Sequence, residues 1–406
     1  MAALLAGLFA ALSVASSAAA QNTAAAAATG AASSAAAPSA SSPATITPQA
    51  VVRHHGALVH AAYSDTAQAA AKLQDSIQAF VAAPSAERLQ AARQAWLNAR
   101  EWYGQTEAFR FYGGPIDDAR GPESRLNAWP MDEAFVDSVA GKPGAGLVNN
   151  RKVKIDLKTL AGYNERDGEE NIATGWHAIE FLLWGQDTSE TGPGNRPATD
   201  YIDGQAPNAD RRRQYLTVVS ELLVSDLRLL VAAWAPDNNK NYRARFDQGG
   251  LESVRKIFVG LGSLSRGELA GERLEVALAS QDQEDEHSCF SDNTHRDAVT
   301  NAQGIENVWL GRWTHADGRV LQGPGLRDLV ASKDAAVAER TTAQIAASVA
   351  AAKAIQAPFD REIIGGQSAP GPQRIRATIT SLTQQSRDLV AAANAVGIQK
   401  LTLVQP

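Results

Sequence analysis

Most of this chain consists of long segments in which apolar residues recur at helical spacing, separated by loops rich in Gly and Pro. No convincing run of alternating polar and apolar residues, the pattern of a half-buried strand, is present. Amphipathic helices must bury their apolar faces against one another, so the pattern predicts an all-α fold made of up-and-down helical bundles. The expected helices cover residues 50–82, 85–112, 132–140, 155–161, 169–184, 209–235, 249–281, 297–310, 325–356 and 372–397.

The order of long helices, loops and an apolar helix restarts after residue 208. A chain of 406 residues is also longer than a domain with a single hydrophobic core usually is. We therefore expect two related bundles packed together, an N-terminal one at residues 47–208 and a C-terminal one at residues 209–406.

A short similarity between residues 175–185 and 301–311 supports an internal duplication. Gln303 stands in the second segment where the first has His177. If the duplication is real, only the N-terminal half would have kept this histidine. The matching positions are Ile179, Glu180 and Gly185 with Ile305, Glu306 and Gly311.

The N-terminus has the features of an export signal. Residues 1–20 hold a short apolar region followed by small residues, and Ala18–Ala20 fits an A-x-A cleavage site that would leave Gln21 as the new N-terminus. Residues 21–46 are almost wholly Ala, Ser, Thr and Pro, without charge, and are expected to form a disordered linker. The sequence thus predicts an exported protein of the periplasm or the outer membrane.

Charge and cysteine content exclude several classes of function. The net charge is −6 and is spread along the chain, whereas a nucleic-acid-binding protein would carry a basic stripe. The single cysteine, Cys289, can form neither an internal disulfide nor a cysteine-rich zinc or iron–sulfur site. It is interpreted as a buried small apolar residue, with a role as a thiolate ligand as the alternative.

The motif with the clearest chemistry is His177-x-x-Glu180, inside the expected apolar helix 169–184. Side chains three residues apart lie on one face of a helix, so an imidazole and a carboxylate could share one metal ion. This pair suits Fe, Zn, Mn or Cu rather than Ca or Mg, which prefer oxygen ligands. The alternative is a core His–Glu pair satisfied by hydrogen bonds.

A third ligand is expected from the helix before the first long loop. Arg100, Tyr103, Glu107 and Arg110 recur at helical spacing and share a face, and Glu107 is the favoured ligand among them. A solvated face joined by salt bridges is the alternative. The predicted pocket around the metal consists of Gly175, Trp176, Arg100, Tyr103 and Arg110.

Residues 285–297 form a second source of ligands, because two His, one Cys and several acids fall within thirteen residues. Asp292 and His295 are the predicted ligands there. Capping of the helix that begins near His295 is the alternative; it would explain Asp292 and Thr294, but not the density of ligand-type residues.

Two of these segments resemble the imelysin-like family, also called peptidase M75 or iron-regulated protein A. Residues 175–187 fit the family motif G-x-H-x-x-E, and residues 288–297 resemble a segment of its iron-regulated branch. The resemblance covers roughly residues 47–400. It implies two related helical bundles with a functional cleft at their interface, export, and a link to iron uptake. It carries over Gly175, His177 and Glu180 as the motif residues.

These observations predict an exported protein that binds a metal ion, with iron preferred over zinc or copper, for iron acquisition. The expected partners are the ion itself and an outer-membrane or periplasmic transport component, and no nucleic acid. A metallopeptidase is the first alternative, although the motif H-E-x-x-H is absent from the sequence. The inverted motif H-x-x-E-H is also absent, because Phe181 follows Glu180. A binding module in which the His–Glu pair is purely structural is the second.

Overall fold

The computed structural model describes residues 46–189 and 191–404, which belong to one compact unit. The predicted signal peptide, residues 1–20, lies outside the described residues, as does the predicted linker except for residue 46. Within the described part of the chain, no helix combines the length and the apolar character needed to cross a membrane.

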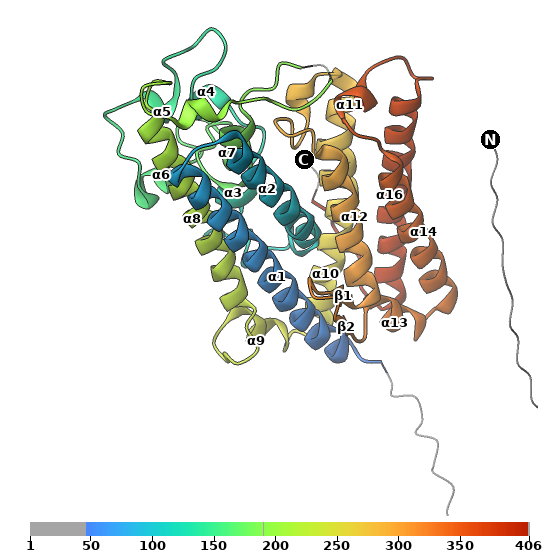
Figure 1. The fold of residues 1–406 in the computed structure, drawn as a ribbon. Coiled ribbons are helices and arrows are strands. Elements are labelled where there is room, and N and C mark those ends of the chain that lie inside the picture. The colour runs from blue at the N-terminus through green and yellow to red at the C-terminus, as the bar shows by residue number, and fades with distance from the viewer. Residues whose placement is uncertain (1–45, 190, 405–406) are drawn as a thin grey trace, which may run out of the picture. The chain divides into compact units, whose positions relative to one another are not determined.

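Two long antiparallel helices, α1 (Pro48–Ala82) and α2 (Ala86–Thr106), begin the fold, and α8 (Ala209–Ala233) packs along α1 (Figure 1). Side chains cap both helices at their first turn. The Thr47 hydroxyl accepts a hydrogen bond from the Ala50 amide, and the Ser85 hydroxyl accepts one from the Arg88 amide. Both caps satisfy amides that lack a partner within the helix.

The segment between α2 and α8 carries short helices joined by long loops. One of them, α7 (Gly175–Trp184), is buried at every residue and packs against α2, α3 and α8. The others are η1 (Glu107–Phe109), α3 (Glu123–Asn127), α4 (Glu133–Val136), α5 (Gly146–Asn149), α6 (Leu157–Tyr163) and η2 (Ala198–Tyr201).

The C-terminal part is a second group of helices, in which α12 (Thr294–Leu310), α14 (Ala335–Ala354) and α16 (Pro370–Ala395) stand side by side (Figure 1). A continuous helical stretch, α10 (Leu251–Ser263), η3 (Leu264–Glu275) and α11 (Val276–Ser280), has π-helical geometry in its middle and packs on α16. The remaining elements are α9 (Tyr242–Phe246), η4 (Gln283–Asp285), β1 (Arg312–Thr314), β2 (Val320–Gln322), α13 (Leu326–Ala331) and α15 (Asp360–Ile363).

The all-α prediction is confirmed, since the described strands amount to one antiparallel hairpin of β1 and β2. The expected helix 169–184 begins later, at Gly175, whose φ of 88° is strained for any residue with a side chain. The expected helix 325–356 is divided into α13 and α14, because Asp334 caps a new helix by accepting from the Val337 amide.

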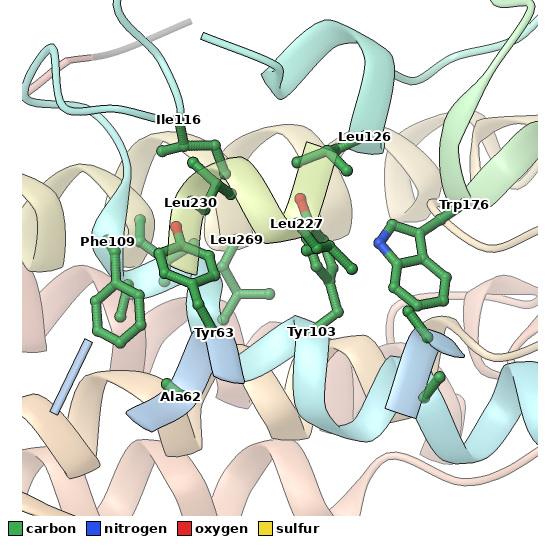
Figure 2. Packing of buried hydrophobic residues seen from close by; sticks show 14 of the residues in the cluster. Ala62, Tyr63, Tyr103, Phe109, Ile116, Leu126, Trp176, Leu227, Leu230 and Leu269 are labelled. Carbon is green, nitrogen blue, oxygen red and sulfur yellow. The ribbon is translucent and has the colours of Figure 1, made fainter. Parts of the chain in front are cut away.

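The predicted division at residue 208 stays a prediction, as does the internal duplication. Contacts are extensive across that boundary, because α1 packs on α8 and α2 packs on α12. Figure 2 shows the aromatic side chains Phe109, Tyr63, Tyr103 and Trp176 in one row through the core. Edge-on and tilted contacts join the rings in pairs, with centroids 5.6 Å apart for Tyr63 and Phe109 and 5.3 Å apart for Tyr103 and Trp176.

Helices α2 and α12 approach each other at two glycines. A Cβ atom on Gly104 would lie 2.0 Å from the Thr300 hydroxyl oxygen, and one on Gly304 would lie 2.3 Å from the Gln105 carbonyl oxygen. Neither distance allows a carbon atom, so the crossing requires glycine at both positions.

We expect Gly304→Ala to lower the melting temperature, because the added methyl group meets backbone and must push α2 and α12 apart, at a cost of about 1–3 kcal/mol. Gly162→Ala is the matched control, because nothing lies within 4 Å of its Cβ position in α6. That variant should be neutral or slightly stabilising, since Ala is the better helix former. Equal melting temperatures for both variants would contradict the close crossing.

Candidate metal centre

His177 and Glu180 lie together in the buried interior, as their spacing predicts. The His177 Nδ1 atom is 2.9 Å from Oε2 of Glu180, and both side chains are buried. Gly175 allows this placement, because a Cβ atom there would lie 2.5 Å from the Leu126 carbonyl oxygen. The first turn of α7 therefore sits directly against α3.

The second oxygen of Glu180 is also occupied. Oε1 accepts hydrogen bonds from the Ser291 amide, at 3.0 Å, and from the Ser291 hydroxyl, at 2.6 Å. Glu180 thus connects α7 to the loop before α12 and orients the His177 ring. The direct ligand role that we predicted for Glu180 would require it to release one of these bonds.

The remaining nitrogen of His177 is free. Its Nε2 atom is buried and has no hydrogen-bond partner among the described residues. Burial, with a smaller effect from the Arg100 charge, lowers the pKa of His177 well below its usual value, so the ring is neutral at pH 7. When Glu180 is ionised it accepts from Nδ1, and Nε2 then carries the lone pair that binds metals. Burial raises the pKa of Glu180 to about 8, so a cation that binds His177 at pH 7 would have to displace the proton of Glu180.

A second histidine, His287, lies against the first. Their ring centroids are 4.8 Å apart in an edge-on contact. Its Nδ1 atom is 2.7 Å from Oδ2 of Asp297, and its Nε2 atom is 3.4 Å from the Asn127 amide nitrogen. Burial lowers the pKa of His287 to about 3, with a further contribution from Arg273. Both rings therefore share one pattern: a carboxyl group at Nδ1, and an Nε2 atom with no partner in His177 and only a long contact in His287.

The Asp297 carboxylate accepts hydrogen bonds from three neighbouring side chains of this region. Its Oδ1 atom accepts from Arg100 at 2.9 Å, and its Oδ2 atom accepts from the Ser288 hydroxyl at 2.5 Å as well as from His287. Burial alone would raise the pKa of Asp297, but the Arg100 charge and the His287 and Ser288 hydrogen bonds outweigh burial and lower it far below its usual value. Asp297 is therefore ionised.

Arg100 is held by the surrounding aromatic rings. Its guanidinium carbon lies 5.4–5.7 Å from the ring centroids of Trp96, Tyr103 and Trp176, and Nη1 donates to the Asn127 side chain at 2.6 Å. Arg100, Tyr103 and Trp176 thus lie together in the interior, and their role in a metal pocket stays a prediction.

The structure gives Glu107 arginine partners. Its Oε2 atom accepts from Arg110 and from Arg273, each at 2.7 Å. These charges overcome the effect of burial and lower the pKa of Glu107 to about 2. The salt-bridged alternative describes this face better than a ligand role does, although the face is buried rather than solvated.

Asp292 and His295 do not contact His177. The His295 ring bonds through Nδ1 to the Asp292 carbonyl oxygen, at 3.0 Å, and lines a surface pocket with Glu101 and Arg296. The Asp292 carboxylate belongs to a separate group of acids. The metal roles that we predicted for these residues stay predictions.

Comparisons with known proteins now decide the family. The family described as imelysin (peptidase M75) matches residues 59–389. This chain belongs to the imelysin family. The resemblance found in the motif segments is thus confirmed.

The similar proteins carry related names. Iron-regulated protein A of Synechococcus elongatus is 26% identical over 371 residues, which cover 89% of this chain and 88% of that protein. The crystal structure of a putative iron-regulated protein A precursor from Parabacteroides distasonis is 18% identical, with a TM-score of 0.67 over 88% of this chain and 97% of the other. An imelysin-like protein from Psychrobacter arcticum is 16% identical, with a TM-score of 0.61 over 86% and 96%. At these identities, the two structures show that the imelysin fold is shared.

Several residues of this imelysin site escaped the sequence analysis. Most of the segment 285–297 is buried, and the members that join the His177–Glu180 network are His287, Ser291 and Asp297, whereas His295 is only half-buried. A signal for Asp297 was present in the sequence: Asp297, Asn301 and Ile305 are spaced at i, i+4 and i+8, so Asp297 shares the buried face of α12.

We expect both imidazoles to stay neutral between pH 8 and pH 5 in the folded protein, because burial disfavours their charged forms. NMR signals of the His177 and His287 rings should therefore not titrate in that range. Titration of either ring near pH 6.5 would show that it reaches solvent.

The same burial has a consequence for stability. The unfolded chain binds a proton at each of these histidines below about pH 6.5 that the folded chain does not bind, so the stability that the neutral rings contribute is present above pH 6.5 and is lost as the pH falls. His287→Gln should accordingly reduce the loss of unfolding free energy between pH 6.5 and pH 5, as measured by denaturant titration.

Proposed function

We propose that this imelysin-family chain is an exported protein that binds iron for acquisition at the cell envelope, with His177 as the central ligand. The observation that carries the proposal is the His177 Nε2 atom, a buried nitrogen of a neutral imidazole that has no hydrogen-bond partner among the described residues. An unsatisfied polar atom inside a protein is costly and calls for an explanation. A cation bound to this nitrogen is an explanation that fits the chemistry of a neutral imidazole.

The surroundings of His177 fit a metal site in a second respect. A ligating histidine almost always donates its other ring N–H to a carboxylate or carbonyl, which fixes the ring orientation and raises its basicity. Glu180 has this position at His177, and Asp297 has it at His287. His287 could join His177 as a ligand by giving up its long contact with Asn127.

Iron is preferred as the cargo for two reasons. Imidazole with carboxylate suits Fe, Zn, Mn or Cu, whereas Ca and Mg prefer oxygen alone. The name of the Synechococcus relative, iron-regulated protein A, connects the family with iron. A transport component of the periplasm or outer membrane would then receive or deliver the ion.

One observation favours a second function, a binding module in which the pair is structural. Both oxygens of Glu180 already have donors, and the positive charge of Arg100 is close enough to lower the pKa of His177. In that case His177 would only position the loop before α12 through Glu180.

Metal titration of chelator-stripped protein separates the two functions. We expect wild-type protein to bind ferrous iron in calorimetry under anaerobic conditions, and His177→Ala to lose at least about 10-fold in affinity. His60→Ala is the matched control, because His60 lies on α1 and is half-buried, away from the motif. Glu180→Gln should lose about 10–100-fold, as removal of an orienting carboxylate does.

Equal affinity of wild type and His177→Ala would refute the metal site. If His177→Ala and Glu180→Ala also unfold the protein while no metal raises its melting temperature, the structural module is the correct function. Hydrolysis of an unstructured protein substrate that stops with chelator and in Glu180→Ala would instead support a peptidase.

Export has its own test. Protein purified from the cell envelope should begin at Gln21, because Ala18–Ala20 fits the recognition pattern of a signal peptidase. N-terminal sequencing measures this directly. A mature chain that begins at Met1 would contradict export by this route.

A further inference from the structure

Beside the candidate metal centre lies a second group of acids that its chemistry does not use. Asp187, Asp292 and Asp360 each contribute a carboxylate oxygen to a set whose members lie within 4.8 Å of one another. The three side chains are 3%, 5% and 1% exposed. They come from three distant segments: the loop after α7, the loop before α12, and the first residue of α15.

The carboxylates of this acidic group lack compensating donors. Neither oxygen of Asp292 or Asp360 has a hydrogen-bond partner in normal geometry within the described residues, and Oδ2 of Asp187 has none either. Only Oδ1 of Asp187 is satisfied, by the Ser189 amide at 2.8 Å. The described residues also provide no lysine, arginine or histidine in an ion pair with any of the three.

A fourth acid, Glu286, also lacks compensating donors. Its side chain is fully buried, and neither carboxyl oxygen has a hydrogen-bond partner in normal geometry among residues 46–189 and 191–404. It faces Asp360, and burial together with the Asp360 charge raises the pKa of Glu286 well above its usual value. Four buried carboxyl groups without a cation are an arrangement that proteins avoid unless a positive charge binds there.

We propose that Asp187, Asp292 and Asp360, with Glu286 beside them, form a site for one hard divalent cation of the Ca²⁺ type, distinct from the His177 centre. All donors are carboxylate oxygens, which suit Ca²⁺ or Mg²⁺ rather than metals that select imidazole or thiolate. Ca²⁺ forms bonds of about 2.3–2.6 Å, so two of its ligands lie at most about 5 Å apart, and the three oxygens here all lie within 4.8 Å of one another. Mg²⁺ demands a tighter octahedron and retains water, for which a buried site leaves less room.

The site has a route to solvent. Asp292 also lines the surface pocket that holds His295, and this pocket is bordered by Ala357 and Pro358, immediately before α15. A cation could therefore enter without unfolding of the core. Once bound, it would connect α15 to the loops that flank α7 and α12, and so stabilise three parts of the chain that no described ion pair joins.

The test uses chelator-stripped full-length protein and CaCl₂. We expect calorimetry to show one Ca²⁺ per chain, and the melting temperature to rise by about 2 °C or more at a free Ca²⁺ concentration 100 times Kd. Asp360→Asn and Asp292→Asn should each lose at least 10-fold in affinity. Asp75→Asn, which removes an exposed acid of α1, is the matched control and should bind like wild type.

The metal-free variants provide a second, opposite readout. Because Asp360→Asn removes one of several crowded acids, its melting temperature without Ca²⁺ should equal or exceed that of wild type, so failure to fold would not explain lost binding. An absence of Ca²⁺ binding by wild type would overturn the proposal and indicate carboxyl groups that share protons instead. Stronger stabilisation by Mg²⁺ than by Ca²⁺ would overturn the choice of cation.

This inference stands apart from the proposed iron site. His177→Ala should retain the response to Ca²⁺, and Asp360→Asn should retain binding of ferrous iron. If iron binding fails while Ca²⁺ binding holds, only the His177 proposal falls. If ferrous iron competes with Ca²⁺ and loses affinity in Asp360→Asn, the acidic group is itself the iron site and the Ca²⁺ proposal is wrong.

Discussion

The interaction on which the interior depends is the buried carboxylate of Asp297. It joins α2 through Arg100, the loop before α12 through Ser288, and the candidate metal centre through His287. A buried ion is tolerated only when its partners restore most of the hydration energy that it loses, and Asp297 has a charged partner and two further donors. Loss of any one partner would leave charge without compensation in a region that water does not reach.

Buried arginines need a partner of opposite charge for the same reason. Two of the buried arginines, Arg100 and Arg273, each have a carboxylate partner in the interior: Asp297 for the first, Glu107 for the second. The partners in each pair come from segments more than 160 residues apart. The pair of Arg100 on α2 with Asp297 on α12 can form only if these two helices cross closely, which explains why glycines stand at the crossing. The close packing of these two helices is thus a condition for the ion pair that holds the site together.

This coupling also explains what the sequence could and could not predict. Helical periodicity and capping residues are local, so most of the long helices were predicted to within a few residues, although 325–356 is divided and 169–184 begins only at Gly175. The contact of His177 with Glu180 follows from a single helical turn. The environment of Glu107 depends on Arg273, which a pattern within one helix cannot reveal. In the segment 285–297, composition indicated a site, but the choice between inward and outward residues depends on a loop in which Asp292 has a positive φ of 55°. Local rules do not predict such a turn.

The two groups of ionisable residues are linked through consecutive residues of that loop. Ser291 donates two hydrogen bonds to Glu180, and the next residue, Asp292, contributes its carboxylate to the acidic group. A positive φ at Asp292 turns these neighbouring side chains toward different parts of the interior. Consecutive residues of one loop therefore serve two groups of different chemistry, an imidazole–carboxylate pair and a set of carboxylates. The turn at Asp292 is what allows the two groups to lie side by side in the interior without sharing a side chain.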